Sequence, residues 1–452
     1  MTSAPSAGQG WRLASLSLAM LLPSLGISVA NIALPSLRTA FDVTSQDAQW
    51  VVIAYLVVVT SSLVTVGRLG DLLGRKPLLL AGIAIFSLAS IAAVFSATIW
   101  IVVVARAVQG VGAAMMMSLT VAAVSDAVRP ERSGSAMGLL GTVSAIGTAA
   151  GPSLGGLLVG MFGWASIFVL MAGAGLVAAL LVGVQLPTAA KGSRRPAFDL
   201  PGAFTLMLSV AAFALATTLN PITSANGILA GAAVLSVAAF VGIERRASAP
   251  LVQLDVVTRP VVAAGLLSIG LVSAIVMTTL VVGPFYLTGV LGLDTANAGL
   301  VMTIGPTVSA VVGFPAGRLV DRRGSTATAY AGLFTLLAGT VGMMILPGTM
   351  GVAGYICSLV LITAGYALFQ AANNTALMAG AQKDQRGVMS ALLALGRNVG
   401  LITGASAMGA LFALASGGTA TTGQFGLQIV FAAASAFVIL ALALSAWSAR
   451  SK

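Results

Sequence analysis

Histidine is absent from this 452-residue sequence, and Cys357 is its only cysteine. Metal sites in proteins rely mainly on histidine, cysteine and carboxylate ligands, and a disulfide needs two cysteines. The sequence therefore excludes histidine-ligated metals, disulfide frameworks and thiol pairs. We expect a protein without a cofactor and without a metal site.

Charged residues are also scarce, at 7% of the chain, whereas hydrophobic residues make up 58%. A soluble domain usually has about a quarter of its residues charged. Apolar runs of about 20 residues, the length that crosses a bilayer, recur from Trp11 to Trp447. The sequence therefore predicts a protein embedded in a lipid bilayer, without a sizeable aqueous domain.

The net charge of +11 could by itself suggest a nucleic-acid partner. The basic residues are dispersed in small groups between apolar segments, however, and no basic arm or aromatic-interleaved patch is present. We therefore interpret the charge as a topology signal and expect no nucleic acid as a partner.

Glycine, proline and charged breaks divide the sequence into fourteen predicted spans, from a first near residues 13–36 to a last near 425–448. The first apolar run is too long for a signal peptide, so we expect an uncleaved helix. With the N-terminus inside, nearly all basic residues fall in cytoplasmic segments; Arg38 lies outside, and Arg106 and Arg397 lie within spans. The positive-inside rule then predicts that both termini are cytoplasmic.

Two loops share a G-R-x-x-D pattern, at Gly67–Asp71 and at Gly317–Asp321. Because these loops follow the second and the tenth spans, the pattern indicates an internal duplication, although short basic loops can also look alike by chance. The fold class we predict is an all-α polytopic membrane protein with two pseudo-symmetric six-helix bundles and two inserted helices. The predicted bundles are residues 1–186 and 259–452, and residues 187–258 form a cytoplasmic linker with the inserted helices.

These loops, together with two span motifs, give the chain a family resemblance. Arg106–Gly112 reads R-x-x-Q-G-x-G, and Gly147–Gly156 contains a glycine-rich stretch with a proline. In these features the chain resembles the major facilitator superfamily, specifically its fourteen-helix drug:proton antiporter branch. The resemblance implies a secondary-active exporter of drug-like molecules, and we expect it to work as a monomer.

At one position this sequence differs from the usual sequence of that branch. The end of the first span usually carries L-D-x-T-I-V-N-V-A-L-P, whereas Leu25–Pro35 here has Gly26 at the position of the acid. In the family this acid is tied to proton coupling and cation recognition. Protons therefore stay only a candidate coupling partner for this chain.

The acidic residues sharpen this point, because all eleven lie in predicted loops or at span ends. A proton carrier in a helical transporter is normally a buried Asp, Glu or His, and the sequence offers none at mid-membrane. Two arginines, Arg106 and Arg397, remain inside spans. A guanidinium within the membrane should face the bundle interior or a water-filled cavity. Its planar set of donors suits carboxylate, phosphate or sulfonate groups. The candidate substrate-binding residues are Arg106, Arg397, Asn31, Tyr55, Gln109, Gln370, Asn373 and Asn374, with Tyr366 and Asn398 nearby.

A structural alternative stays open for each of these residues. Arg106 could merely bond helix carbonyls, Arg397 could merely support packing, and each polar neighbour could make an interhelical hydrogen bond.

A second group of candidates concerns gating. The loop aspartates and arginines can form a charged clasp on the cytoplasmic face, and the glycines and proline of the fifth span combine close packing with a bend. Simple topogenic charge and packing without gating are the alternatives. The candidate gating residues are Arg68, Asp71, Arg75, Asp126, Arg318, Asp321, Gly147, Gly151, Pro152 and Gly155.

The functional hypothesis is a secondary-active efflux transporter that exports small molecules, drug-like or metabolite, by alternating access. One alternative is an exporter of organic anions that lacks a membrane-embedded carboxylate for proton coupling. Another is a membrane sensor on a transporter scaffold. An enzyme is disfavoured, since no buried nucleophile with a base or metal is available. Compact loops and an uncleaved first helix suggest a bacterial inner membrane.

Overall fold

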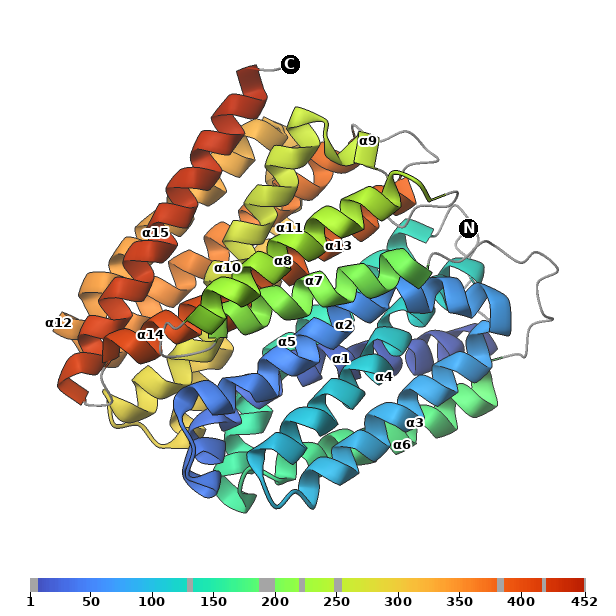
Figure 1. Ribbon diagram of the computed structural model, residues 1–452, viewed down its shortest axis with the longest axis horizontal. Helices are drawn as coiled ribbons and strands as arrows, with labels where there is room; N and C mark the ends of the chain where they lie inside the picture. The colour runs from blue at the N-terminus through green and yellow to red at the C-terminus, as the bar shows by residue number, and fades with distance from the viewer. Residues whose placement is uncertain are drawn as a thin grey trace.

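The computed structural model of the protein describes residues 7–127, 133–186, 200–218, 224–247, 254–379, 386–416 and 420–450. Within these ranges the secondary structure is helical, and no strand occurs. The helices run roughly parallel or antiparallel to one another in two groups that lie side by side (Figure 1).

The first group is a six-helix bundle. Its members are α1 (Ala7–Phe41), α2 (Ser45–Leu73), α3 (Arg75–Val94), α4 (Ile99–Ala127), α5 (Ser133–Phe162) and α6 (Ser166–Gln185). Helix α1 packs on α5 and α6, α2 packs on α4, and α3 packs on both α4 and α6. The six helices therefore form one closed group around a shared apolar interior.

The second group follows a short helix, α9 (Leu254–Val257). It consists of α10 (Pro260–Gly289), α11 (Thr295–Arg323), α12 (Ser325–Ala379), α13 (Arg386–Thr403), a π-helical segment η2 (Gly404–Met408), α14 (Gly409–Ser416) and α15 (Ala420–Arg450). Helix α12 is two helices joined at Gly351, whose φ of 58° is readily adopted only by a residue without a Cβ. This break lies between the eleventh and twelfth predicted spans, near residues 326–346 and 352–379.

The inserted helices α7 (Leu200–Thr218) and α8 (Ser224–Glu244) pack on each other as a hairpin. Helix α7 contacts α2 of the first bundle and also η2, α13 and α14 of the second. Figure 1 shows this green pair lying along the junction of the two bundles. The insertion therefore covers one flank of the junction. Residues 187–199, the part of the predicted 187–258 segment that precedes α7, lie outside the described ranges.

The surface of the bundles is apolar, as a lipid environment requires. Large hydrophobic side chains such as Leu88, Val104, Leu235 and Ile439 are exposed along the helices. Nine helices in the described part of the chain are long and apolar enough to cross a membrane, and every predicted span falls on a helix. The total of fourteen spans stays a prediction.

The two bundles touch at one end through glycines. A Cβ built on Gly156 of α5 would lie 2.9 Å from the Cα of Gly299 in α11, and a Cβ on Gly299 would lie 2.5 Å from the carbonyl oxygen of Pro152. These contacts lie toward the end of the molecule where α5 ends and α11 begins, which we call the far side. The opposite end, where α1 begins and α15 ends, is the termini side. The halves are thus joined closely on the far side.

Candidate functional site

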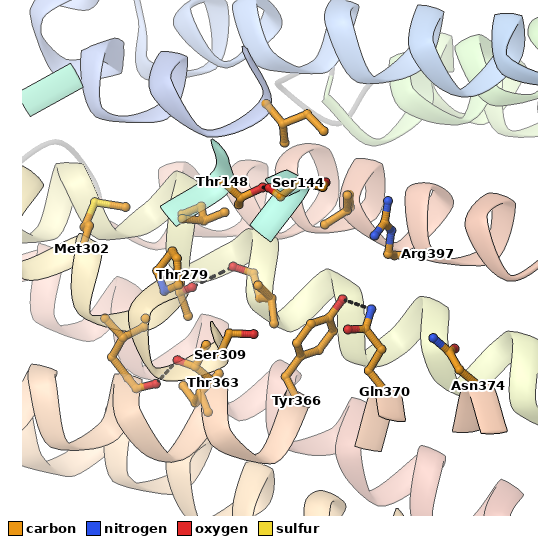
Figure 2. Close-up of a pocket in the computed structure, with 18 of the residues that line it drawn as sticks. Ser144, Thr148, Thr279, Met302, Ser309, Thr363, Tyr366, Gln370, Asn374 and Arg397 are labelled. Atoms are coloured by element: carbon orange, nitrogen blue, oxygen red, sulfur yellow. Dashed lines mark hydrogen bonds between the residues drawn. The ribbon is translucent and has the colours of Figure 1, made fainter. Parts of the chain in front are cut away.

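A cavity of about 430 Å³ lies between the two bundles, within the range of about 300–1,000 Å³ typical of small-molecule sites. Its walls come from α1, α4 and α5 of the first bundle and from α10, α11, α12 and α13 of the second. Both halves therefore contribute to a single candidate site (Figure 2).

One end of the cavity is polar. Tyr366, Gln370 and Asn374 lie four residues apart on α12, so they share one helix face, and Arg397 of α13 lines the same cavity. Gln370 donates from Nε2 to the Tyr366 hydroxyl oxygen at 2.9 Å. The Nε of Arg397 has no hydrogen-bond partner among the described residues. Figure 2 shows these four side chains gathered at one end of the cavity. They offer a cation and several neutral hydrogen-bond donors to a ligand.

The hydroxyl groups along the walls are mostly engaged with their own helices. Thr279 donates to the Val276 carbonyl at 2.7 Å, and Thr363 donates to the Leu359 carbonyl. A hydroxyl engaged in this way presents its oxygen as an acceptor but has no second proton to donate. Near Arg397, donors come from the guanidinium itself and from the side-chain amides of Gln370 and Asn374.

The remaining walls are apolar and adaptable. Met20, Met117 and Met302 line the cavity together with Leu280 and Ile362. Methionine has a flexible, polarisable side chain that contacts aromatic rings favourably. The middle of the cavity can therefore accept the apolar body of a ligand without fixing its shape.

No acidic residue lines this cavity within the described part of the chain. The described acids lie in turns or near helix ends, as Asp294 does at the start of α11, where its side chain accepts from the backbone N–H of Asn297 at 2.7 Å. The charge of Arg397 is thus not balanced by a carboxylate in the described cavity wall.

Arg106, the other arginine within a span, lies inside the first bundle and does not line the cavity. Its side chain is fully buried, with Nε donating to the Val51 carbonyl at 3.0 Å and Nη2 to the Gly26 carbonyl at 2.8 Å. Nη1 donates to Gln109, and the guanidinium lies 3.9 Å from the ring centroid of Tyr55. Arg106 therefore ties α4 to α1 and α2, which corresponds to the structural alternative for this residue.

Four further predicted binding residues are also placed within the bundles, away from the cavity wall. Tyr55 donates to the Pro23 carbonyl at 2.9 Å, Gln109 donates to Ser90 at 2.6 Å, Asn31 donates to the Ile27 carbonyl at 2.8 Å, and Asn373 donates to the Gly265 carbonyl at 3.3 Å. Of the predicted binding residues, Arg397, Gln370 and Asn374 line the cavity. The nearby Tyr366 lines it too, whereas Asn398 does not.

The predicted gating glycines form close helix contacts inside the first bundle. A Cβ on Gly147 would lie 2.7 Å from the Leu21 carbonyl oxygen, and one on Gly151 would lie 1.9 Å from the Ser28 hydroxyl. Gly155 packs on α1 in the same way. These distances explain why the positions are glycine, and they fit the packing alternative, while a role in movement stays a prediction.

The predicted charged clasp is described only in part. Arg75 is the first residue of α3, while Arg318 and Asp321 are exposed near the end of α11. The side chains of Arg68, Asp71 and Asp126 lie outside the described part of the structure. The clasp therefore stays a prediction.

Sequence reasoning did not single out Tyr355, which lines the cavity from α12. A signal was available in the spacing of the lining residues, since Tyr355, Leu359, Tyr366, Gln370 and Asn374 follow one helix face. An apolar helix in a bundle has several faces, however, and the sequence does not say which of them meets the other half.

The family profile described as Major Facilitator Superfamily matches residues 16–405. This chain belongs to the major facilitator superfamily. It is therefore a multi-pass membrane protein of a transporter family, whose members are generally carriers and not enzymes.

Three relatives and one solved structure illustrate the similarity. The chain is 29% identical to the uncharacterized transporter YebQ of Escherichia coli, covering 84% of each chain. It is 28% identical to the multidrug efflux pump LfrA of Mycolicibacterium smegmatis, over 88% of this chain and 80% of that one. It is 30% identical to the tetracenomycin C resistance and export protein of Streptomyces glaucescens, over 90% of this chain and 76% of that one.

Among solved structures, a bacterial homologue of the human lysosomal transporter Spinster, in an inward-facing conformation, has a TM-score of 0.73 at 15% identity. The alignment covers 99% of this chain and 98% of that one. This likeness supports the fold, and the sequence relatives support the transporter family.

Proposed function

We propose that this chain exports small organic anions by alternating access of the central cavity to the two sides of a bacterial inner membrane, with both termini in the cytoplasm. The observation that carries the proposal is the cavity itself, where Arg397 stands among neutral donors and no acid lines the described walls. A guanidinium within the membrane is costly unless it meets water or a partner, so an anionic ligand is its natural counterpart. Relatives named as efflux and export proteins support the direction of transport.

The membrane potential provides a driving force for such export. Moving one charge through 100 mV is worth about 2.3 kcal/mol. For an anion leaving a compartment that is negative inside, this term favours export and requires no proton site. Gly26, at the position of the family's acid, uses its carbonyl oxygen to accept from Arg106, so that position carries no titratable group.

The test is transport in proteoliposomes with anionic, neutral and cationic probes under separately imposed voltage and pH gradients. We expect anions to be preferred, voltage to change their flux, and proton counterflow to be absent. Arg397→Gln should remove the preference for anions, whereas Arg397→Lys should retain part of it because the charge remains without the planar fork.

Arg246→Gln is the matched control, since Arg246 is exposed just beyond α8 and does not line the cavity. A preference for cations, or stoichiometric proton counterflow in the unmodified protein, would overturn the proposal. Tight binding of an anion without any flux would favour the sensor alternative.

A further inference from the structure

Tyr355 carries a hydrogen-bonding group that the anion site does not explain. Its side chain is only 1% exposed, it lines the central cavity, and its hydroxyl has no hydrogen-bond partner within the described structure. Buried hydroxyl groups are nearly always paired because an unmade hydrogen bond is costly. An unpaired one in a ligand cavity therefore indicates a missing partner.

The neighbouring tyrosine provides an internal comparison. Tyr286 and Tyr355 stack with ring centroids 6.1 Å apart and an angle of 17° between the rings. The Tyr286 hydroxyl donates to Oε1 of Gln424. In the same stacked pair, one hydroxyl thus has a protein partner and the other has none among the described residues.

The Tyr355 hydroxyl lies close to the backbone of Gly283 and to the side chain of Met302. A Cβ on Gly283 of α10 would lie 2.5 Å from this hydroxyl and 3.5 Å from Cε of Met302. The hydroxyl therefore rests beside bare backbone, next to a methionine that itself lines the cavity. Since methionine is flexible, Met302 can move aside when a ligand enters.

The two polar groups lie at opposite ends of the cavity. Figure 2 shows Met302 at one end and Arg397 at the other. Along α12, the rise from Tyr355 to Tyr366 is about 16 Å at 1.5 Å per residue. The walls between them combine apolar side chains such as Leu280, Leu359 and Ile362 with the hydroxyl groups of Thr279 and Thr363, which donate to their own helices.

We propose that Tyr355 selects elongated amphiphilic anions that carry a hydrogen-bond acceptor, such as a carbonyl oxygen, at the end remote from their acidic group. The acidic group meets Arg397, the apolar body fills the middle, and the remote oxygen accepts from the Tyr355 hydroxyl. This proposal rests on the proposed anion export and adds the length and the second polar group of the substrate.

The experiment compares two synthetic probes of equal charge and similar length, 4-(4′-acetylbiphenyl-4-yl)butanoate and its 4′-isopropyl counterpart, in proteoliposome transport. The acetyl probe carries the remote acceptor and the isopropyl probe does not. The measured quantity is the kcat/KM of the acetyl probe divided by that of the isopropyl probe. We expect this ratio to be about ten-fold higher in the unmodified protein than in Tyr355→Phe, which is the effect of about one buried hydrogen bond. Tyr355→Phe should reduce transport of the acetyl probe more than transport of the isopropyl probe.

Two further variants keep the test independent of folding defects. Tyr286→Phe removes a hydroxyl from the same stacked pair and should retain the preference for the acetyl probe. Gly283→Ala keeps Tyr355 but places a methyl group against its hydroxyl, so the preference should be lost.

The outcomes separate the two proposals. An unchanged preference in Tyr355→Phe would overturn the role of Tyr355 while anion export stands. Unchanged flux of both probes in Arg397→Gln would overturn the anion site, and this inference with it.

Discussion

Arg106→Ala tests whether a buried arginine in the first bundle acts on structure or on substrate. The arginine makes three hydrogen bonds, to the carbonyls of Val51 and Gly26 and to the side chain of Gln109, and it stacks on Tyr55. With about 1 kcal/mol net for each hydrogen bond and about 1–2 kcal/mol for a desolvated cation–π contact, the variant should lose about 4–5 kcal/mol of stability. We therefore expect poor folding and, with it, loss of transport.

The assay is thermal stability of the detergent-purified protein, measured as the fraction that stays monodisperse on size exclusion after heating. Arg246→Ala serves as control, because surface substitutions usually change stability by less than about 0.5 kcal/mol. An Arg106→Ala protein with unchanged thermal stability and no transport would refute this reasoning. Arg106 would then act on the substrate, as the sequence-based hypothesis for this residue supposes.

Two further predictions concern glycines. Gly26→Asp places a Cβ 3.0 Å from the Tyr55 hydroxyl and puts a carboxyl group next to Arg106. We therefore expect pH-dependent transport or acceptance of cations in the proteoliposome assay. An unchanged pH profile of transport would contradict this prediction. Gly156→Ala brings a methyl group within 2.9 Å of the Gly299 Cα, so the far side should close less well and transport should fall several-fold. Gly173→Ala, which meets nothing within 4 Å, should transport normally, and equal effects of the two substitutions would exclude the contact as the cause.

Most of the architecture could be predicted because hydropathy and loop charge are signals summed over whole segments, so single residues affect them little. The predicted spans fall on helices, and the break before the twelfth span coincides with Gly351 at its positive φ. The π-helical segment Gly404–Met408, which packs against α10, α7 and α2, has no such segment-wide signal. The sequence also gave no reason to place α7 along the junction of the bundles, because its apolar residues fit lipid and protein equally well.

The candidate site could be predicted only in part. The sequence indicates how deep in the membrane a polar residue lies more readily than which face of its helix carries it. Gln370 and Asn374 were found as polar residues in an apolar span, and they lie on the cavity face of α12. Asn373, one residue away, turns about 100° around the helix and bonds to the Gly265 carbonyl instead. A single helical step thus decides between binding a ligand and binding a neighbouring helix.

The two arginines differ for a further physical reason. Arg106 lies about 10 Å from the far-side end of α4. All its hydrogen-bond partners belong to its own bundle, so a rocking of the two halves against each other would leave these contacts intact. Arg397 lines the boundary between the halves, where Met20, Met117 and Ser144 of the first bundle line the same cavity. Rocking would therefore change the surroundings of Arg397 and not those of Arg106. A charge whose surroundings change between access states can couple ligand binding to that change, since a ligand shifts a conformational equilibrium only through a difference in its affinity for the two states.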